Sequence, residues 1–138
     1  MPEVPIYGFG HSMGTGILLE SAQTKIYAGL VLYNPYNRPS DLVKEYNLEN
    51  WESFMLGRPF RNDLNIQSVK TYNYKLPIVI CSSRQDTTID FQTQALLVNE
   101  ASQNPNITIL WIRQDGNHSD FLAKESLRMT FDFLIQQS

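Results

Sequence analysis

The chain has 138 residues, 42% of them apolar, and a formal net charge of −3, which fits one domain with a packed core. The small acidic charge, without runs of lysine or arginine, argues against nucleic acid or an anionic membrane as the main partner. No segment has the length of a membrane span or the pattern of a signal peptide, so we expect a cytoplasmic protein.

Four short apolar runs predict the strands of a sheet. In chain order they cover residues 6–9, 30–33, 78–82 and 107–112. Each run is nearly continuous in apolar residues, which is typical of parallel strands covered on both faces. The third run contains Cys81, the single cysteine, which we expect to be a small core residue.

Helical patterns follow these runs. Residues 17–22 are helix-like, and apolar residues recur at i, i+4 and i+7 in two later segments. Those segments contain Phe91, Ala95 and Val98, and then Leu127, Phe131 and Leu134. The alternation of strand and helix predicts an α/β fold with a mostly parallel sheet of about four strands and flanking helices.

Residues 34–75 interrupt this alternation. They are rich in Asn, Tyr and Pro, and Leu48, Trp51 and Met55 share one face of a short predicted helix. So long a connection favours a small cap over the strand ends, although a surface excursion without contact to substrate stays open. The aromatic residues here either line a substrate cleft or form the cap's own core. The candidate side chains for substrate contact are His11, Tyr36, Trp51 and Phe54.

The sequence Gly-His-Ser-Met-Gly at residues 10–14 lies between the first strand and the first helix. This G-x-S-x-G pattern predicts a nucleophile elbow, a sharp turn that presents Ser12 at the end of a strand. The turn is expected to leave no room for bulky residues on either side of Ser12, which accounts for Gly10 and Gly14. The amide of Met13, at the helix start, would face a developing oxyanion.

A nucleophilic serine needs a base to take its proton and an acid to orient that base. The chain has two histidines. His11 precedes the serine and is expected to point away from it, as a packing or hydrogen-bonding residue. His118 lies in a turn-rich loop after the fourth strand, where catalytic groups collect in parallel sheets. We therefore predict that His118 is the general base.

The acid is expected after the third strand, which gives the chain order Ser, Asp, His. Asp86 is the first carboxylate there and is our prediction. Asp90 competes with it, but it occupies a position where a helix start favours a carboxylate. Asp115 and Asp120 flank the histidine and are typical of turn and cap residues.

Together these motifs resemble the carboxyl-terminal half of an α/β-hydrolase. Residues 28–35 and 115–120 are similar to segments of Bem46-like and serine-aminopeptidase-like members. The resemblance implies a partial α/β-hydrolase fold and a serine hydrolase that forms an acyl-enzyme from a carboxylic ester, thioester or amide. Ester cleavage is favoured over peptide cleavage, and lipid or acyl-protein substrates are implied by analogy. No cofactor is implied, and the separated histidines and lone cysteine predict no metal site.

Members of that superfamily have further strands before the elbow strand, and the loop after one of them supplies a second oxyanion amide. This chain contains neither that strand nor its His-Gly motif. We therefore expect the strand from Ile6 to Phe9 to have an unpaired apolar edge, through which the chain joins a second copy or a missing N-terminal half. A fragment, a complete short protein and a degenerate relative all stay open. The alternative function is a non-catalytic interaction module that uses this edge.

Overall fold

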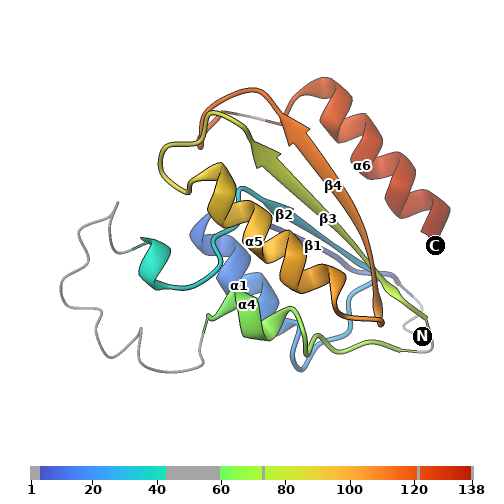
Figure 1. Ribbon diagram of the computed structural model, residues 1–138. Helices are drawn as coiled ribbons and strands as arrows, with labels where there is room; N and C mark the ends of the chain where they lie inside the picture. Colours follow the sequence, from blue (N-terminus) through green and yellow to red (C-terminus); the bar gives the residue numbers. More distant parts are fainter. Residues whose placement is uncertain (1–3, 43–59, 73, 121, 138) are drawn as a thin grey trace.

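The structure is a computed structural model and describes residues 4–42, 60–72, 74–120 and 122–137. Strands and helices alternate along the chain (Figure 1). The elements are β1 (Tyr7–His11), α1 (Met13–Ser21), β2 (Gly29–Tyr33), α4 (Asn62–Asn65), β3 (Leu76–Ser83), α5 (Phe91–Ser102), β4 (Ile107–Gln114) and α6 (Lys124–Gln137). The four predicted strands are confirmed. Strands β3 and β4 run further than their apolar cores because their pairing continues to Ser83 and Gln114.

The four strands form one parallel sheet in the order β1-β2-β3-β4. Their carboxyl ends therefore lie at the same edge of the sheet. The segments that follow β1, β2, β3 and β4 carry Ser12, Asn34, Asp86 and His118 respectively. Side chains that are far apart in the sequence are thus brought to one place by the topology alone.

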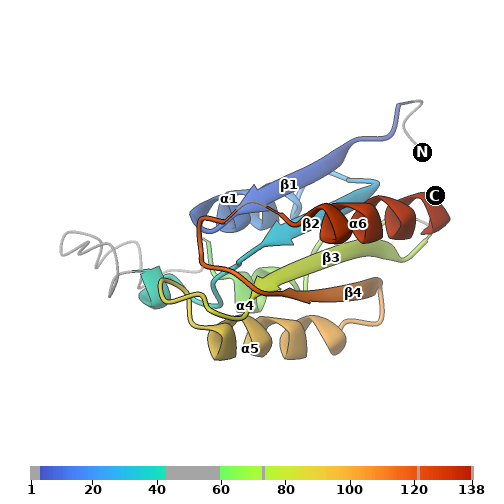
Figure 2. The same cartoon turned by 90° about the horizontal axis from the view of Figure 1, so that it is seen from above.

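Helices cover both faces of the sheet, which gives three layers (Figure 2). Helices α1, α4 and α5 lie on one face, and α6 lies on the other. Alternate residues of the strands enter the two cores: Leu30 and Leu32 face α1 and α5, whereas Val31 and Tyr33 face α6. Cys81 is buried in the α6 core, as predicted. In the part of the chain that the structure describes, no helix combines the length and apolar character needed to cross a bilayer.

Residues 60–70, a described part of the predicted cap segment, lie against α1. Asn62 in α4 donates through Nδ2 to Thr15 Oγ1 at 3.1 Å, and the Lys70 amide donates to the Ala22 carbonyl at 2.7 Å. Residues 60–70 therefore pack beside α1, from its first turn to its end. Residues 43–59, which include Trp51 and Phe54, lie outside the described residues, so a cap over Ser12 stays a prediction.

Strand β1 is an edge strand within the described residues, where it pairs with β2 alone. Its side chains alternate between buried and exposed, and Phe9 is 57% exposed. An apolar groove of about 340 Å³ lies between β1 and α6. On the α6 side Phe131 and Ile135 line it and are 59% and 70% exposed. The predicted apolar edge is therefore present, whereas association through it stays a prediction.

Candidate active site

Ser12 lies in the sharp turn between β1 and α1. Its backbone has φ 55° and ψ −117°, a conformation that is costly for a residue other than glycine and persists where the surroundings enforce it. Here the Ser12 amide donates to the Tyr33 carbonyl at 3.0 Å, and α1 begins at the next residue. The Ser12 side chain does not cap α1. It is held at the carboxyl end of β1, as the elbow prediction requires.

The two glycines of this turn have different surroundings. A Cβ atom on Gly10 would lie 2.8 Å from the Gly14 carbonyl oxygen and 3.0 Å from the Thr15 Cα atom. The close approach of strand and helix therefore requires glycine at position 10. At Gly14 a Cβ atom would meet no described atom within 4 Å. The expectation of a tight fit on both sides is thus confirmed for Gly10 and wrong for Gly14, whose Cβ position faces away from the described packing.

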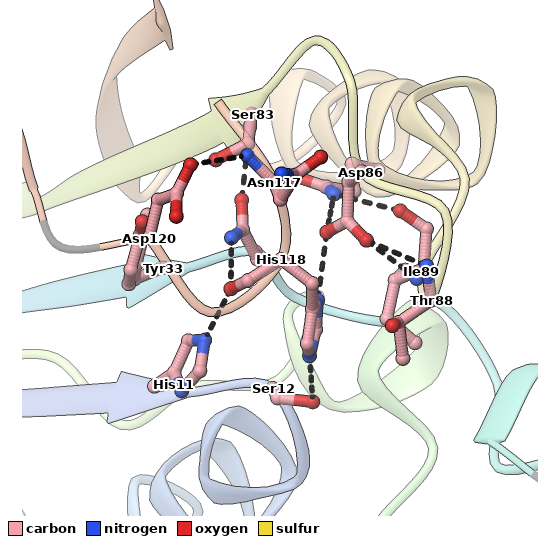
Figure 3. Close-up of polar contacts among 12 residues, drawn as sticks. His11, Ser12, Tyr33, Ser83, Asp86, Thr88, Ile89, Asn117, His118 and Asp120 are labelled. Carbon is pink, nitrogen blue, oxygen red and sulfur yellow. Dashed lines mark hydrogen bonds and ion pairs between the residues drawn. The ribbon is translucent and has the colours of Figure 1, made fainter. Parts of the chain in front are cut away.

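His118 lies in the loop after β4 and points toward Ser12 (Figure 3). Its Nε2 atom is 2.7 Å from Ser12 Oγ. Its carbonyl oxygen accepts two hydrogen bonds, from Asn34 Nδ2 at 2.8 Å and from His11 Nε2 at 2.9 Å. These two hydrogen bonds hold the backbone of the loop at His118 and thereby help to orient the imidazole ring.

Asp86 lies directly behind His118 and is buried. Its Oδ1 atom accepts from the amides of Thr88 and Ile89, both at 2.9 Å. Its Oδ2 atom accepts from Gln94 Nε2 at 2.9 Å and lies 2.7 Å from His118 Nδ1. An ionised carboxylate offers about four acceptor sites. All four are used here, so the structure matches the charged form of Asp86.

The saturated carboxylate determines the tautomer of the histidine. Asp86 can only accept, so His118 donates its Nδ1 proton. In the neutral ring Nε2 then carries a lone pair, and the Ser12 hydroxyl donates to it. The arrangement can take a proton from Ser12 and hold the resulting imidazolium against a carboxylate, which are the two tasks that a serine nucleophile requires.

The other candidate acids are occupied elsewhere. Asp90 caps α5 and accepts from the Gln92 amide at 2.9 Å. Asp115 pairs with Arg84 on the surface at 3.1 Å, and Asp120 accepts from the Asn117 amide at 2.8 Å. Asp86 is the acid that contacts His118. The cap position expected for Asp90 and the turn position expected for Asp120 are confirmed, whereas Asp115 forms a surface ion pair.

Two buried residues of this cluster were missed in the sequence. Asn34 directly follows β2 and has φ 48°. Its Oδ1 accepts from the Ser83 amide at 2.9 Å, and its Nδ2 donates to the His118 carbonyl. Gln94 lies on α5 and reaches Asp86. The signal for Asn34 was its place before Pro35 at a strand end, since asparagine tolerates positive φ. For Gln94 the sequence held no signal, because a glutamine on a helix is usually exposed.

His11 lies at the margin of the site, and its ring stacks on Tyr33 with a centroid distance of 4.9 Å. Together with its bond to the His118 carbonyl, this confirms the packing and hydrogen-bonding role. A cavity of about 210 Å³ opens beside His11, between Phe9, Tyr33 and the Ser119–Asp120 segment. Contact of His11 with a substrate stays a prediction.

Tyr36 is a candidate either for a substrate cleft or for the core of the cap, and its surroundings favour the packing role. It is buried with Leu42 and Ile89, and its hydroxyl donates to the Phe60 carbonyl at 2.6 Å. A Cβ atom on Gly16 would overlap that hydroxyl, so glycine allows Tyr36 to pack on α1. Burial, and then the charges of nearby carboxylates, raises the pKa of Tyr36 far above its ordinary value.

Groups for other chemistry are sparse around this site. Burial raises the pKa of the Cys81 thiol to about 12, against a smaller opposite effect of a hydrogen bond with Ser126. The thiol is therefore protonated at neutral pH and is a poor nucleophile. Among the described residues, no three His, Cys, Asp or Glu side chains lie together as metal ligands would.

Known structures share this architecture. An esterase of Pyrococcus furiosus superposes with a TM-score of 0.72 at 17% identity, over 96% of this chain and 54% of the esterase. Acyl-protein thioesterase 2 of Zea mays gives a TM-score of 0.61 at 12% identity, over 99% of this chain and 58% of the thioesterase. The chain has a partial α/β-hydrolase fold. It spans about half the length of these two α/β-hydrolase structures.

A sequence relative agrees with this assignment of the fold. The lysophosphatidylserine lipase ABHD12 of Danio rerio is 26% identical to the chain, and the match covers 75% of the chain and 30% of the lipase. No family model matches.

Proposed function

We propose that the chain carries the catalytic centre of a serine hydrolase that cleaves a carboxylic ester or thioester. The observation that carries the proposal is the continuous chain of contacts Ser12 Oγ–His118 Nε2 and His118 Nδ1–Asp86 Oδ2, each 2.7 Å long. All three residues are buried, which supports their acting as one unit.

The reaction follows from these positions. Ser12 Oγ attacks the carbonyl carbon while its proton passes to His118 Nε2, and Asp86 stabilises the imidazolium. The amide of Met13 is one of the first in α1 and has no intrahelical acceptor, so it donates to the oxyanion. Collapse of the tetrahedral intermediate transfers the proton from His118 to the leaving alcohol or thiol and leaves the acyl group on Ser12. Water then attacks the acyl carbon while its proton passes to His118 Nε2. Ser12 Oγ leaves with that proton and the carboxylic acid is released.

The names of the similar proteins support the ester and thioester class. One is called a lysophosphatidylserine lipase, one an esterase and one an acyl-protein thioesterase. A puromycin-hydrolysing peptidase of Mycobacterium tuberculosis shares the fold with a TM-score of 0.72 at 10% identity, over 95% of this chain and 22% of the peptidase. Amide substrates therefore stay in the proposal behind esters and thioesters.

The test is covalent labelling with a fluorophosphonate at neutral pH, read by intact mass. We expect one adduct per chain, and none after Ser12→Ala or His118→Ala. Ser102→Ala is the matched control, because Ser102 is an exposed serine on α5 whose hydroxyl bonds only to a nearby carbonyl in the described structure. An adduct that survives either active-site substitution would contradict the proposal.

A second candidate function is a non-catalytic module that associates through the β1 edge. The exposed Phe9 and the groove beside α6 favour it, since a bare apolar strand edge is a template for another polypeptide. A folded chain that associates but takes no fluorophosphonate would favour this candidate over the hydrolase.

A further inference from the structure

We propose that Gln94 is a positioning residue of the active site: its side-chain amide holds the Asp86 carboxylate in the orientation that receives His118. The inference rests on the proposed function for its effect on rate, but its structural part can be tested in an inactive protein. Gln94 lies at the second turn of α5, outside the three residues of the Ser-His-Asp set.

The contacts of Gln94 lead to the reacting groups through one atom. Gln94 Nε2 is 2.9 Å from Asp86 Oδ2, the same oxygen that lies 2.7 Å from His118 Nδ1. The same Nε2 also donates to the Ile89 carbonyl at 2.9 Å. Gln94 thereby links α5, the turn after β3 and the acceptor oxygen of the histidine.

The orientation of the Gln94 amide is determined by its neighbours. Two acceptors, Asp86 Oδ2 and the Ile89 carbonyl, face the same end of the side chain, so that end carries the NH2 group. The amide oxygen is then buried, and no described residue donates to it. A buried polar atom without a partner is costly. An apolar side chain would avoid that cost, but it would also leave Asp86 Oδ2 without its donor from α5.

The physical effect is to fix a carboxylate that could otherwise rotate. A rotation about the Cβ–Cγ bond moves both carboxylate oxygens. The amides of Thr88 and Ile89 oppose it at Oδ1, and Gln94 opposes it at Oδ2, the oxygen that His118 Nδ1 contacts. Hydrogen bonds to a charged acceptor are about twice as strong as neutral ones, so a single amide is enough for this task.

The experiment compares Gln94→Met and Gln94→Asn with Gln92→Met in the full chain. Methionine keeps the length of the side chain without a donor, and asparagine keeps an amide that is one methylene too short to reach Asp86. Gln92 lies on the exposed side of the same helix and provides the matched control. For each protein we would record the low-field proton NMR signal of His118 Nδ1–H, assigned by its loss in His118→Ala, and the second-order rate of fluorophosphonate labelling.

We expect both Gln94 variants to weaken or broaden the Nδ1–H signal by faster exchange and to lower the labelling rate about 10- to 100-fold, the range for one hydrogen bond to a charged group. Gln92→Met should change neither. An unchanged signal and rate in folded Gln94 variants would overturn the proposal, even if their melting temperature fell. Absence of labelling in the wild type, together with a signal that still depends on Gln94, would contradict the hydrolase function and support the positioning role.

Discussion

The carboxyl end of the sheet and the edge at β1 are built on opposite principles. At the carboxyl end, Asp86 is saturated by four donors and the His118 carbonyl by two. At the β1 edge, large apolar side chains such as Phe9 and Ile135 are exposed along a groove that nothing in the described chain fills. The Asp86 carboxylate and the His118 carbonyl thus have their partners within the described residues, whereas the apolar edge is left uncovered by them.

This difference separates the geometry of the site from the burial of apolar surface. The polar cluster is built from the segments after β1 to β4, which one parallel sheet brings together, and from Gln94 on α5. At the edge, the exposed apolar side chains do not gain the free energy of burial, about 25 cal/mol per Å², unless further polypeptide covers them. We therefore expect substitutions at the carboxyl end to change chemistry and substitutions at the edge to change association.

The largest expected effect is that of Asp86→Asn on the labelling rate. The Thr88 and Ile89 amides require an acceptor, so the asparagine oxygen must face them and its NH2 group must face His118 Nδ1. That arrangement enforces the wrong tautomer of His118, and we expect a loss of about 10⁴-fold, as in other triads. Phosphonylation kinetics measure it.

The matched control for this prediction is Asp90→Asn. Asparagine caps a helix about as well as aspartate, so this variant should keep the wild-type rate. Similar losses in both variants would mean that Asp86 has no special relation to His118. The expectation that contacts at the carboxyl end of the sheet control the chemistry would then be wrong.

The fold and the contact of Ser12, His118 and Asp86 could be predicted because they depend on local patterns. A parallel strand buried on both faces is a continuous apolar run, and the chain order of Ser12, Asp86 and His118 follows from the connections between such strands. The strand ends were less predictable, since β3 and β4 continue through the polar residues Ser83 and Gln114 where a neighbouring strand offers backbone partners.

The remaining features depend on contacts that no local pattern encodes. The burial of Gln94 arises from the turn that brings Asp86 over α5, and the spacing of residues on the helix does not reveal it. The helical period groups Phe131 with Leu127 and Leu134, yet Phe131 is exposed while Leu134 is buried. Hydrophobic spacing predicts which residues share a face of α6, but whether that face is covered depends on what packs against it.

The β1 edge provides the next largest effect. We expect the wild-type chain to be oligomeric or to aggregate at micromolar concentration, and Phe9→Lys or Ile135→Lys to weaken that association. Burial of one large apolar side chain contributes about 1.5–3 kcal/mol, so each substitution should raise the dissociation constant about 10- to 100-fold. Light scattering coupled to size exclusion measures the change.

Leu96→Lys is the control for the edge, because Leu96 is comparably exposed on α5, on the other side of the sheet. It should leave association unchanged. A wild-type chain that is monomeric at these concentrations would show that the edge needs no partner, and equal effects of all three variants would indicate a loss of general hydrophobicity only.

Substitutions in the elbow should separate shape from chemistry. Gly10→Ala places a methyl group against the backbone of Gly14 and Thr15, and we expect it to lower the free energy of unfolding by about 1–3 kcal/mol. Gly14→Ala meets no described atom and should change stability by less than about 1 kcal/mol. Urea unfolding measures both. Equal destabilisation by the two substitutions would contradict the asymmetry of the turn.

The smallest expected effect comes from a charge cluster beside α1. Asp63 is 7% exposed and contacts Arg61 and Arg38 at 2.5 and 3.1 Å. Burial alone would raise the pKa of Asp63, but the hydrogen bonds and charges of the two arginines outweigh it and hold this pKa below its ordinary value. A carboxylate with a lowered folded-state pKa stabilises the fold above its unfolded pKa, about 3.9. That stabilisation is lost as the pH falls through the folded-state value.

Arg38 is largely exposed, so we expect the contribution of the Asp63 cluster to be at most about 1 kcal/mol. Asp63→Asn should reduce the free energy of unfolding at pH 6 by that amount and make it less dependent on pH between 5 and 3. Urea unfolding at both ends of this range measures the change, with Asp132→Asn on the exposed side of α6 as the control. Because the hydrogen bonds and ion pairs described for the Asp63 side chain go to Arg38, Arg61 and Leu64, and not to Ser12, His118 or Asp86, Asp63→Asn should leave the labelling rate at neutral pH unchanged. A lower rate would mean that α4 and α1 transmit strain to the elbow, and that the geometry around Ser12 and His118 depends on the Asp63 cluster.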